Sequence, residues 1–280
     1  MNRTLELRSG LVATAFDGHA GLAGCASDWE QLNAGSGRDP LCNRFDWAEA
    51  YAAAWVREGD LFGWRLTDDA GPVAVLAFRK EERPGRFDLG RARLVQDGSY
   101  DSDYLDPPVR PGCEAAVAAD LFDLLAQRSG IQAAVLSPLD STAPLLRSLR
   151  RVAQARRLSP GEEALICPSA PLAESFDGYL SSLKKRMRSK VRQAVRRVDQ
   201  RGATFAWCDD PRRIEADLDD LYRLHAARWR DAGIPGAFAD DRRRQFYRRL
   251  VDQHLPPGRL RFSRLELEGQ TIACQFGVAV

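Results

Sequence analysis

The chain has 280 residues, of which 44% are hydrophobic and 29% charged, a composition typical of an ordinary globular protein with one large or two average domains. The formal net charge of +2 excludes a role for the whole protein as a polycation, so any strongly basic surface must be local. Six cysteines without a C-x-x-C pair and only three histidines exclude a zinc framework and a small disulfide scaffold, and we expect no metal.

The hydrophobic pattern and turn signals of residues 1–168 predict alternating strands and helices. The helix expected over residues 114–128 carries apolar residues at helical spacing and is followed by Gly130, a typical end signal. Asp46 is expected to cap another helix. The remaining expected elements are strands at 4–7, 11–16, 61–66, 73–79, 91–95 and 131–136 and helices at 25–33, 46–57 and 141–157. This order favours an α/β fold, in which helices cover a sheet.

Residues 96–108, with the sequence QDGSYDSDYLDPP, place four aspartates and two tyrosines between strand-like segments. Asp, Gly, Ser and Pro are ordinary turn residues, so a solvated turn cluster is one interpretation. The other is a loop facing a substrate, in which Asp101, Asp103 or Tyr104 orients a nucleophile or takes its proton.

A domain boundary is expected after residue 168, which gives one module over 1–168 and a second over 169–280. The second opens with a basic amphipathic helix predicted over residues 179–201, about 35 Å long. Its apolar residues share one arc: Leu180, Leu183, Met187, Val191, Ala194, Val195 and Val198. Nine Lys or Arg residues accompany one acid, Asp199. Like charges four residues apart repel, so we expect an anion to compensate them, either in the fold or as a partner.

The rest of the second module predicts a strand at 203–207, helices at 214–229 and 242–254, and strands at 260–267 and 271–280. The first half of helix 214–229 is acidic and could neutralise the basic helix within the chain; these acids are Glu215, Asp217, Asp219 and Asp220. Apolar and other residues alternate from 271 to the last residue. Since a chain seldom ends inside an apolar strand, we expect the sequence to lack its C-terminal portion.

Four segments together resemble a known family. They are DGSYDSDY at 97–104, FDGYLSSLKKRMRSKVRQAVRRV at 176–198, LYRLHAARWRDAGIPGAF at 221–238 and RLRFSRLELEGQTIA at 259–273. In this order they resemble the CelD-like acetyltransferases, a branch of the GNAT superfamily whose double-GNAT layout is akin to that of the FemAB peptidyltransferases. The resemblance covers most of residues 40–280. It implies two GNAT-like α/β modules, the second incomplete.

The resemblance implies transfer of an acyl group from acetyl-CoA or another acyl-CoA to an amine or hydroxyl of a polysaccharide or cell-envelope intermediate, that is, to a small-molecule or glycan acceptor. Such transfer needs a base for the acceptor and donors for the thioester oxyanion. The family's Gly-rich pyrophosphate loop is absent after residue 271. Two alternatives stay open: a FemAB-type transferase that uses aminoacyl-tRNA, and a non-catalytic module that binds an anionic glycan or lipid precursor.

The candidate catalytic residues are Asp103, Tyr104 and His225. His225 lies on the apolar side of its helix, so a core role competes with a role as base. The candidate residues for binding substrate or an anion are Lys184, Lys185, Arg188, Arg192, Arg228 and Trp229. The last two match the family's motif. For the basic helix, a solvated face and nucleic-acid binding are the competing interpretations.

The N-terminus lacks a secretion signal, and no window approaches about 18 uncharged apolar residues. We therefore expect no transmembrane segment and a cytoplasmic location, with a membrane-peripheral one as the alternative. The oligomeric state does not follow from the sequence.

Overall fold

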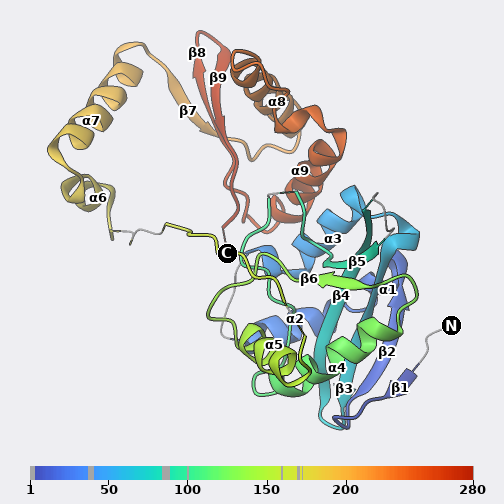
Figure 1. The fold of residues 1–280 in the computed structure, drawn as a ribbon. Helices are drawn as coiled ribbons and strands as arrows, with labels where there is room; N and C mark the ends of the chain where they lie inside the picture. The colour runs from blue at the N-terminus through green and yellow to red at the C-terminus, as the bar shows by residue number, and fades with distance from the viewer. Residues whose placement is uncertain are drawn as a thin grey trace. The chain divides into compact units, whose positions relative to one another are not determined.

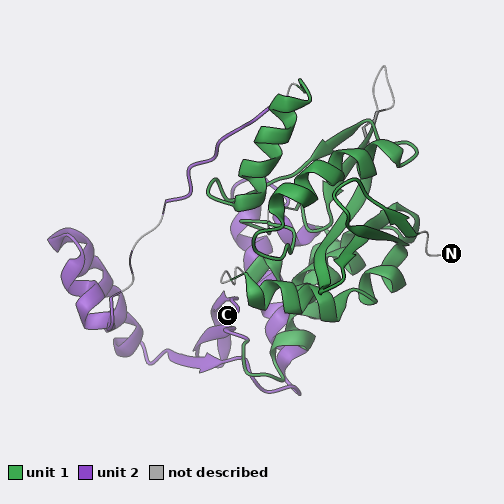
Figure 2. Cartoon of the chain, turned by 90° about the horizontal axis from the view of Figure 1, so that it is seen from below, with its two compact units in different colours: residues 1–159, 240–259, 279–280 green, residues 160–239, 260–278 purple. Residues whose placement is uncertain are grey.

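The computed structural model describes residues 4–36, 41–83, 89–99, 101–158, 160–168, 171 and 173–279. The chain divides into two compact units (Figure 2). Unit 1 comprises Met1–Ser159, Asp240–Arg259 and Ala279–Val280, and unit 2 comprises Pro160–Ala239 and Leu260–Val278. The boundary predicted after residue 168 falls beside residues 169 and 170, which lie outside the described residues, and it stays a prediction.

A six-stranded sheet forms the centre of unit 1 (Figure 1), with its strands side by side in chain order. Strands β1 to β5 are antiparallel neighbours, and β6 runs parallel to β5 because helix α4 (Glu114–Gln127) carries the chain back across the sheet. The strands are β1 Thr4–Glu6, β2 Val12–Asp17, β3 Leu61–Asp68, β4 Gly71–Arg83, β5 Leu89–Leu94 and β6 Ala133–Val135. Gly71, at φ 117°, closes the predicted β3–β4 hairpin.

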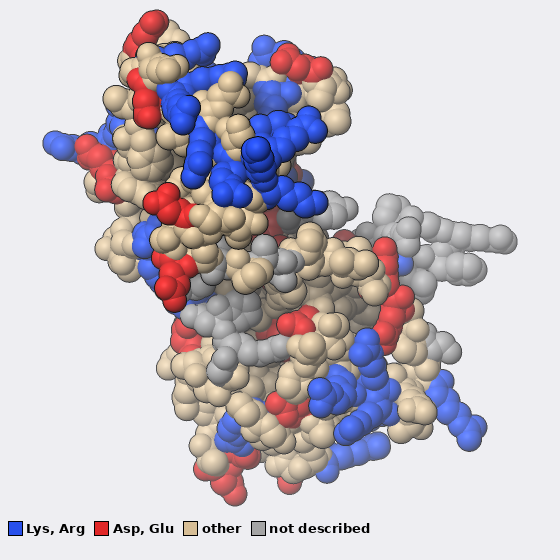
Figure 3. Space-filling view, turned by 90° about the vertical axis from the view of Figure 1, so that its left-hand side faces the viewer, with Lys and Arg blue, Asp and Glu red and all other residues tan. Residues whose placement is uncertain are grey.

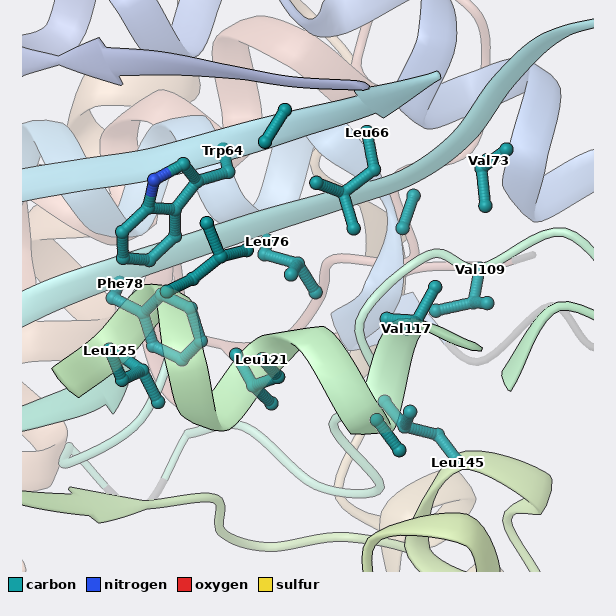
Figure 4. Packing of buried hydrophobic residues seen from close by; sticks show 14 of the residues in the cluster. Trp64, Leu66, Val73, Leu76, Phe78, Val109, Val117, Leu121, Leu125 and Leu145 are labelled. Carbon is teal, nitrogen blue, oxygen red and sulfur yellow. The ribbon is translucent and has the colours of Figure 1, made fainter. Parts of the chain in front are cut away.

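The main core of unit 1 lies between the sheet and α4 (Figure 4). Val117, Leu121 and Leu125 are four residues apart and therefore point to one side of α4, where Figure 4 shows Leu125 beside Phe78 of the sheet and Val117 beside Val109. Helix α5 (Pro144–Ala155) adds its own apolar side chains to this cluster. Each large apolar side chain that is fully buried contributes about 1.5–3 kcal/mol, so this layer stabilises unit 1 substantially.

The α-helices that precede β3 in the described residues are α1 (Gly18–Ala23), α2 (Ala26–Gly35) and α3 (Phe45–Trp55). Helix α3 begins one residue before Asp46, and Arg44 occupies the N-cap position. The prediction that Asp46 caps this helix is therefore wrong. Its carboxylate accepts a hydrogen bond from the Trp47 amide at 2.8 Å, inside the first turn, because Phe45 already has helical geometry.

Helix α9 (Asp241–His254) also belongs to unit 1, although it follows unit 2 elements in the chain. Phe246 is fully buried and packs against Trp47 and Trp55 of α3, with ring centroids 5.0 Å apart in both pairs. Ion pairs and hydrogen bonds to Glu49 flank this contact, from Arg249 at 3.3 Å and Gln253 at 2.8 Å. The interface between α3 and α9 is therefore an aromatic core with a polar edge.

Unit 2 contains a three-stranded antiparallel sheet of β7 (Thr204–Trp207), β8 (Ser263–Leu267) and β9 (Gln270–Gln275). Helix α8 (Ile214–Arg230) packs on β9. The strand predicted over 271–280 ends at Gln275; beyond it, Val278 forms only an isolated bridge with Leu260, and residue 280 lies outside the described residues. The mixed α/β fold class is confirmed.

The predicted basic helix is two helices, so its expected length is wrong. Helix α6 (Phe176–Ser182) and helix α7 (Lys185–Gln200) are separated by Leu183 and Lys184, whose ψ values of 148° and 142° are extended. The hydroxyls of Ser181 and Ser182 donate to the carbonyls of residues 177 and 179, and serine side chains that bond to backbone in this way compete with helix continuation. Helix α7 is thus about 24 Å long.

Of the helices in the described ranges, none combines the length and apolar character needed to cross a bilayer.

Candidate functional site

The aspartate segment, residues 96–108, links β5 to α4 in unit 1 and is anchored at its start. The Asp97 carbonyl accepts hydrogen bonds from the Tyr51 hydroxyl at 2.9 Å and from Arg79 Nε at 3.0 Å. The Asp97 side chain is buried and pairs with Arg93. Burial raises the pKa of this carboxyl, which the Arg93 charge opposes. Asp97 is therefore a structural anchor.

Asp101 is held by α9. Arg243 Nε donates to its Oδ2 at 3.0 Å, the Tyr247 hydroxyl lies 3.5 Å from its Oδ1, and the Arg243 guanidinium also bonds to the Ser99 carbonyl. The Asp101 side chain is only 13% exposed. Because Arg243 engages its carboxylate, Asp101 fixes the segment in place. The sequence analysis missed Arg243, which lies 142 positions away in the chain.

Asp103 and Tyr104 are exposed, while the backbone around them is fixed. The Asn43 side chain donates to the Tyr104 carbonyl at 3.1 Å and accepts from the Asp106 amide at 2.8 Å. Tyr104 has φ 53°, which is uncommon for a residue with a side chain. A residue in this conformation is held by its surroundings, here by Asn43, so the segment presents the two predicted side chains from a defined backbone.

A thiol also lies beside this segment. Cys42 Sγ is 3.4 Å from the Asp103 amide nitrogen. Burial raises the pKa of Cys42 to about 11, so the group is a neutral thiol at neutral pH and a poor nucleophile.

A pocket open to solvent lies at the C-terminal end of the aspartate segment. Asp106, Pro107 and Pro108 of the segment line this pocket, which also borders the first turn of α4 at Glu114 and includes Asn43, the residue that holds the segment. The lining residues are Asn33, Ser36, Asn43, Asp106, Pro107, Pro108, Val109, Pro111, Glu114, Pro144 and Leu145. Apolar walls with a few polar groups are typical of small-molecule sites, so this pocket and the exposed pair Asp103 and Tyr104 form our candidate site in unit 1.

His225 lies in α8 of unit 2, in an aromatic cluster. Trp229 Nε1 donates to His225 Nε2 at 2.9 Å, which places the proton of a neutral imidazole on Nδ1. The Phe238 ring packs edge-on against His225 at 4.9 Å, and a Cβ atom at Gly236 would lie 2.6 Å from His225 Nδ1. This packing supports the core interpretation of His225, and its role as a base stays a prediction. Arg228 is exposed on the same helix.

Two acids of α8 have partners other than the basic helix. Asp217 is buried and binds Arg213 at 3.1 Å and Arg264 at 3.2 Å. Asp220 pairs with Arg223 at 2.7 Å. Both carboxylates therefore form ion pairs with arginines of α8 and of the neighbouring sheet. The hypothesis that the acidic half of α8 neutralises the basic helix is wrong for these two residues.

The positive charges of the Lys and Arg side chains on α7 are not balanced by ion pairs with described acidic side chains. Within the part of the chain that the structure describes, no acidic side chain forms an ion pair with them. Lys184, Lys185 and Arg192 are exposed, and Arg188 donates to the Leu183 carbonyl at 3.2 Å. The blue groups in the upper part of Figure 3 gather over this helix.

No group of three or more His, Cys, Asp or Glu side chains is placed to hold a metal ion among the described residues.

Part of this chain is similar to a known protein family. Residues 185–280 match the family model for an acetyltransferase (GNAT) domain. No curated protein matches the sequence. Among solved structures, an aminoglycoside acetyltransferase from an uncultured soil metagenomic sample is 15% identical, with a TM-score of 0.34 over 58% of this chain and 99% of that chain. A predicted acetyltransferase with acetyl-CoA from Clostridium acetobutylicum is 14% identical, with a TM-score of 0.35 over 56% of this chain and 96% of that chain. A GCN5-related N-acetyltransferase from Ralstonia eutropha JMP134 is 21% identical, with a TM-score of 0.34 over 58% and 99%. The match to the acetyltransferase (GNAT) domain model, over residues 185–280, supports an acyltransferase enzyme.

Proposed function

We propose that the chain is a cytoplasmic, acyl-CoA-dependent N- or O-acyltransferase that acts on a polysaccharide or cell-envelope intermediate. The observation that carries the proposal is the acetyltransferase match over residues 185–280. The CelD-like motifs at 176–198 and 221–238 support the acceptor class. The uncompensated charge of α7 suits an anionic acceptor or the phosphates of CoA.

The proposed reaction is direct transfer. The acceptor nitrogen or oxygen attacks the thioester carbonyl, so that a C–N or C–O bond forms and the C–S bond breaks. The acceptor proton passes to a base, and CoA leaves as the thiol after it takes a proton. A donor that meets the oxyanion during attack lowers the barrier, since charge develops there only in the transition state.

Asp103 is our candidate for the base, with Tyr104 orienting the acceptor. Asp103 has an exposed carboxylate on a fixed backbone, whereas the Asp101 carboxylate is engaged by Arg243. A base must reach the proton that it takes, and the adjoining pocket offers space for an acceptor.

His225 is the second candidate for the base, in unit 2. Its Nε2 accepts from Trp229, so this nitrogen can take a proton only after that hydrogen bond opens. Because Asp103 and His225 belong to different units, each role is proposed and tested by itself.

The proposed anion-binding residues are Lys184, Lys185, Arg188 and Arg192 at α7, and Arg228 with Trp229 at the end of α8. Contacts between exposed charges are screened by salt, so binding through them should weaken as salt rises. The same charges favour the FemAB-type alternative with aminoacyl-tRNA as donor, which competition by tRNA for acetyl-CoA binding would distinguish.

The test uses the full chain, acetyl-CoA and a panel of amino and hydroxyl sugars and anionic oligosaccharides. Release of CoA is followed by chromatography, because the cysteines are free and would react with a thiol dye. Acceptor-dependent release of CoA, with mass-detected acylated product, is the expected result. If calorimetry finds no binding of acetyl-CoA and no acceptor gives turnover, the proposal is wrong. Binding of an anionic glycan without turnover would instead support the non-catalytic module.

A further inference from the structure

The apolar stripe of α7 is exposed to solvent at Met187 and Val195 and half-buried at Val191 and Val198. Met187 is 51% exposed and Val195 47% exposed, and α7 has no buried residue. At 100° per residue, Met187, Val191, Val195 and Val198 lie within an arc of about 80°. Exposed apolar side chains are ordinary when they are scattered, but a continuous stripe along a helix of 16 residues indicates an interaction surface.

Two exposed aromatic side chains lie just before this helix. Phe176 and Tyr179 of α6 are 60% and 41% exposed, and their ring centroids are 6.3 Å apart. Leu180 of α6 is buried, so the exposed apolar surface of residues 176–198 consists of these two rings and the stripe of α7.

Cations border the stripe on both sides. On the same helical projection, Arg188 and Arg192 lie on one flank and Lys190 and Arg197 on the other. Seven of the 16 residues of α7 are Lys or Arg, against one acid, Asp199. A partner for this surface must therefore be anionic and must also bury apolar side chains.

We propose that α6 and α7 form a docking surface for a lipid bilayer with anionic headgroups. The apolar stripe and the two aromatic rings lie among the headgroups and upper acyl chains, and the flanking Lys and Arg contact lipid phosphates. A helix with a strongly basic polar face and an apolar face is the pattern of an interfacial helix. This inference does not depend on the proposed acyl transfer, although it would bring the enzyme to membrane-bound acceptors.

A bilayer fits these observations better than a nucleic acid does. A nucleic acid would neutralise the cations but leave the stripe of Met187, Val191, Val195 and Val198 in water, since phosphate contacts need charge alone. An anionic bilayer contacts both the cations and the apolar stripe, because phosphates and acyl chains lie close together at its interface.

The experiment compares two variants that add the same charge two residues apart. Val195→Asp places a carboxylate on the stripe, whereas Gln193→Asp places it about 150° from the stripe's centre on the same helix. Both positions are exposed, so each variant should fold, as circular dichroism would check. Binding of the full chain to vesicles is measured by flotation, with phosphatidylcholine alone and with about 30 mol% phosphatidylglycerol added.

The proposal expects binding only to the anionic vesicles, weakened as salt rises from about 0.05 M to about 0.5 M. Val195→Asp should weaken this binding about tenfold or more, equivalent to about 1.4 kcal/mol, and Gln193→Asp less than about threefold. Phe176→Ser should weaken it in the same direction as Val195→Asp.

Three outcomes would overturn the proposal. Equal losses in the two variants would mean that only charge is recognised, as for a nucleic acid, and tighter binding to RNA than to vesicles would agree with that. Absence of binding to anionic vesicles would exclude the bilayer. A melting temperature lowered by Val195→Asp alone would mean that the stripe packs against the chain's own apolar surface in solution.

Discussion

Phe246→Ala tests the assignment of α9 to unit 1, the least expected feature of the fold. Phe246 is fully buried, and its ring lies 5.0 Å from those of Trp47 and Trp55 and 5.9 Å from that of Tyr51. Truncation would remove these contacts with the aromatic rings of α3 and leave a cavity that rigid rings cannot fill.

The expected loss is about 4 kcal/mol, since buried Phe→Ala changes cost about 3–5 kcal/mol. The polar edge cannot replace it: the pair of Arg249 with Glu49 is 39% and 34% exposed, and such pairs contribute about 0–1 kcal/mol. A domain is stable by only about 5–15 kcal/mol, so the effect should be large enough to measure.

The assay is urea denaturation followed by tryptophan fluorescence, because Trp47 and Trp55 border the altered site. Arg242→Ala is the matched control, because Arg242 lies on the same helix, is exposed and pairs with Asp240, two residues away. The control should change the free energy of unfolding by less than about 0.5 kcal/mol. If Phe246→Ala stays within about 1 kcal/mol of the unaltered chain, α9 does not pack on α3 as described.

Three further predictions concern the candidate site and pH. Asp103→Asn should lower kcat for acyl transfer by about 100-fold or more with little change in acetyl-CoA affinity, as expected for a general base; full activity would remove Asp103 from the mechanism. Replacing Arg188 and Arg192 together by Gln should weaken acetyl-CoA or anionic-glycan binding in calorimetry and reduce its salt dependence; unchanged affinity would limit them to another role. Burial lowers the pKa of His254 below its ordinary 6.5, so below that pH the unfolded chain binds a proton that the folded chain does not. The free energy of unfolding should therefore fall as pH drops from about 7.5 to about 5.5, and His254→Leu should reduce this fall in urea titrations; an identical fall in both proteins would contradict it.

The sequence by itself determined the elements whose signals are local. The apolar spacing of Val117, Leu121 and Leu125 predicted α4, and the turn before Gly71 predicted the β3–β4 hairpin. The α/β class followed from the order of these elements. Each signal acts within one or two turns of the chain, where propensity and periodicity carry the information.

The basic helix shows where local signals stop. Its charge and its apolar stripe could be predicted from the sequence, but its break at Leu183 and Lys184, next to the backbone-bonded hydroxyls of Ser181 and Ser182, could not. The solvent exposure of its apolar stripe could not be predicted either, because an amphipathic pattern predicts that one face is buried but does not identify the element that buries it.

Tertiary structure alone decided what surrounds the candidate site. Asp101 and Asp103 are two residues apart and chemically identical, yet Arg243 of α9 engages the first while the second is exposed. That difference depends on the packing of Phe246 against α3, a contact between residues about 200 positions apart. Such contacts arise from the shape and burial of the folded chain, which no local window of sequence contains.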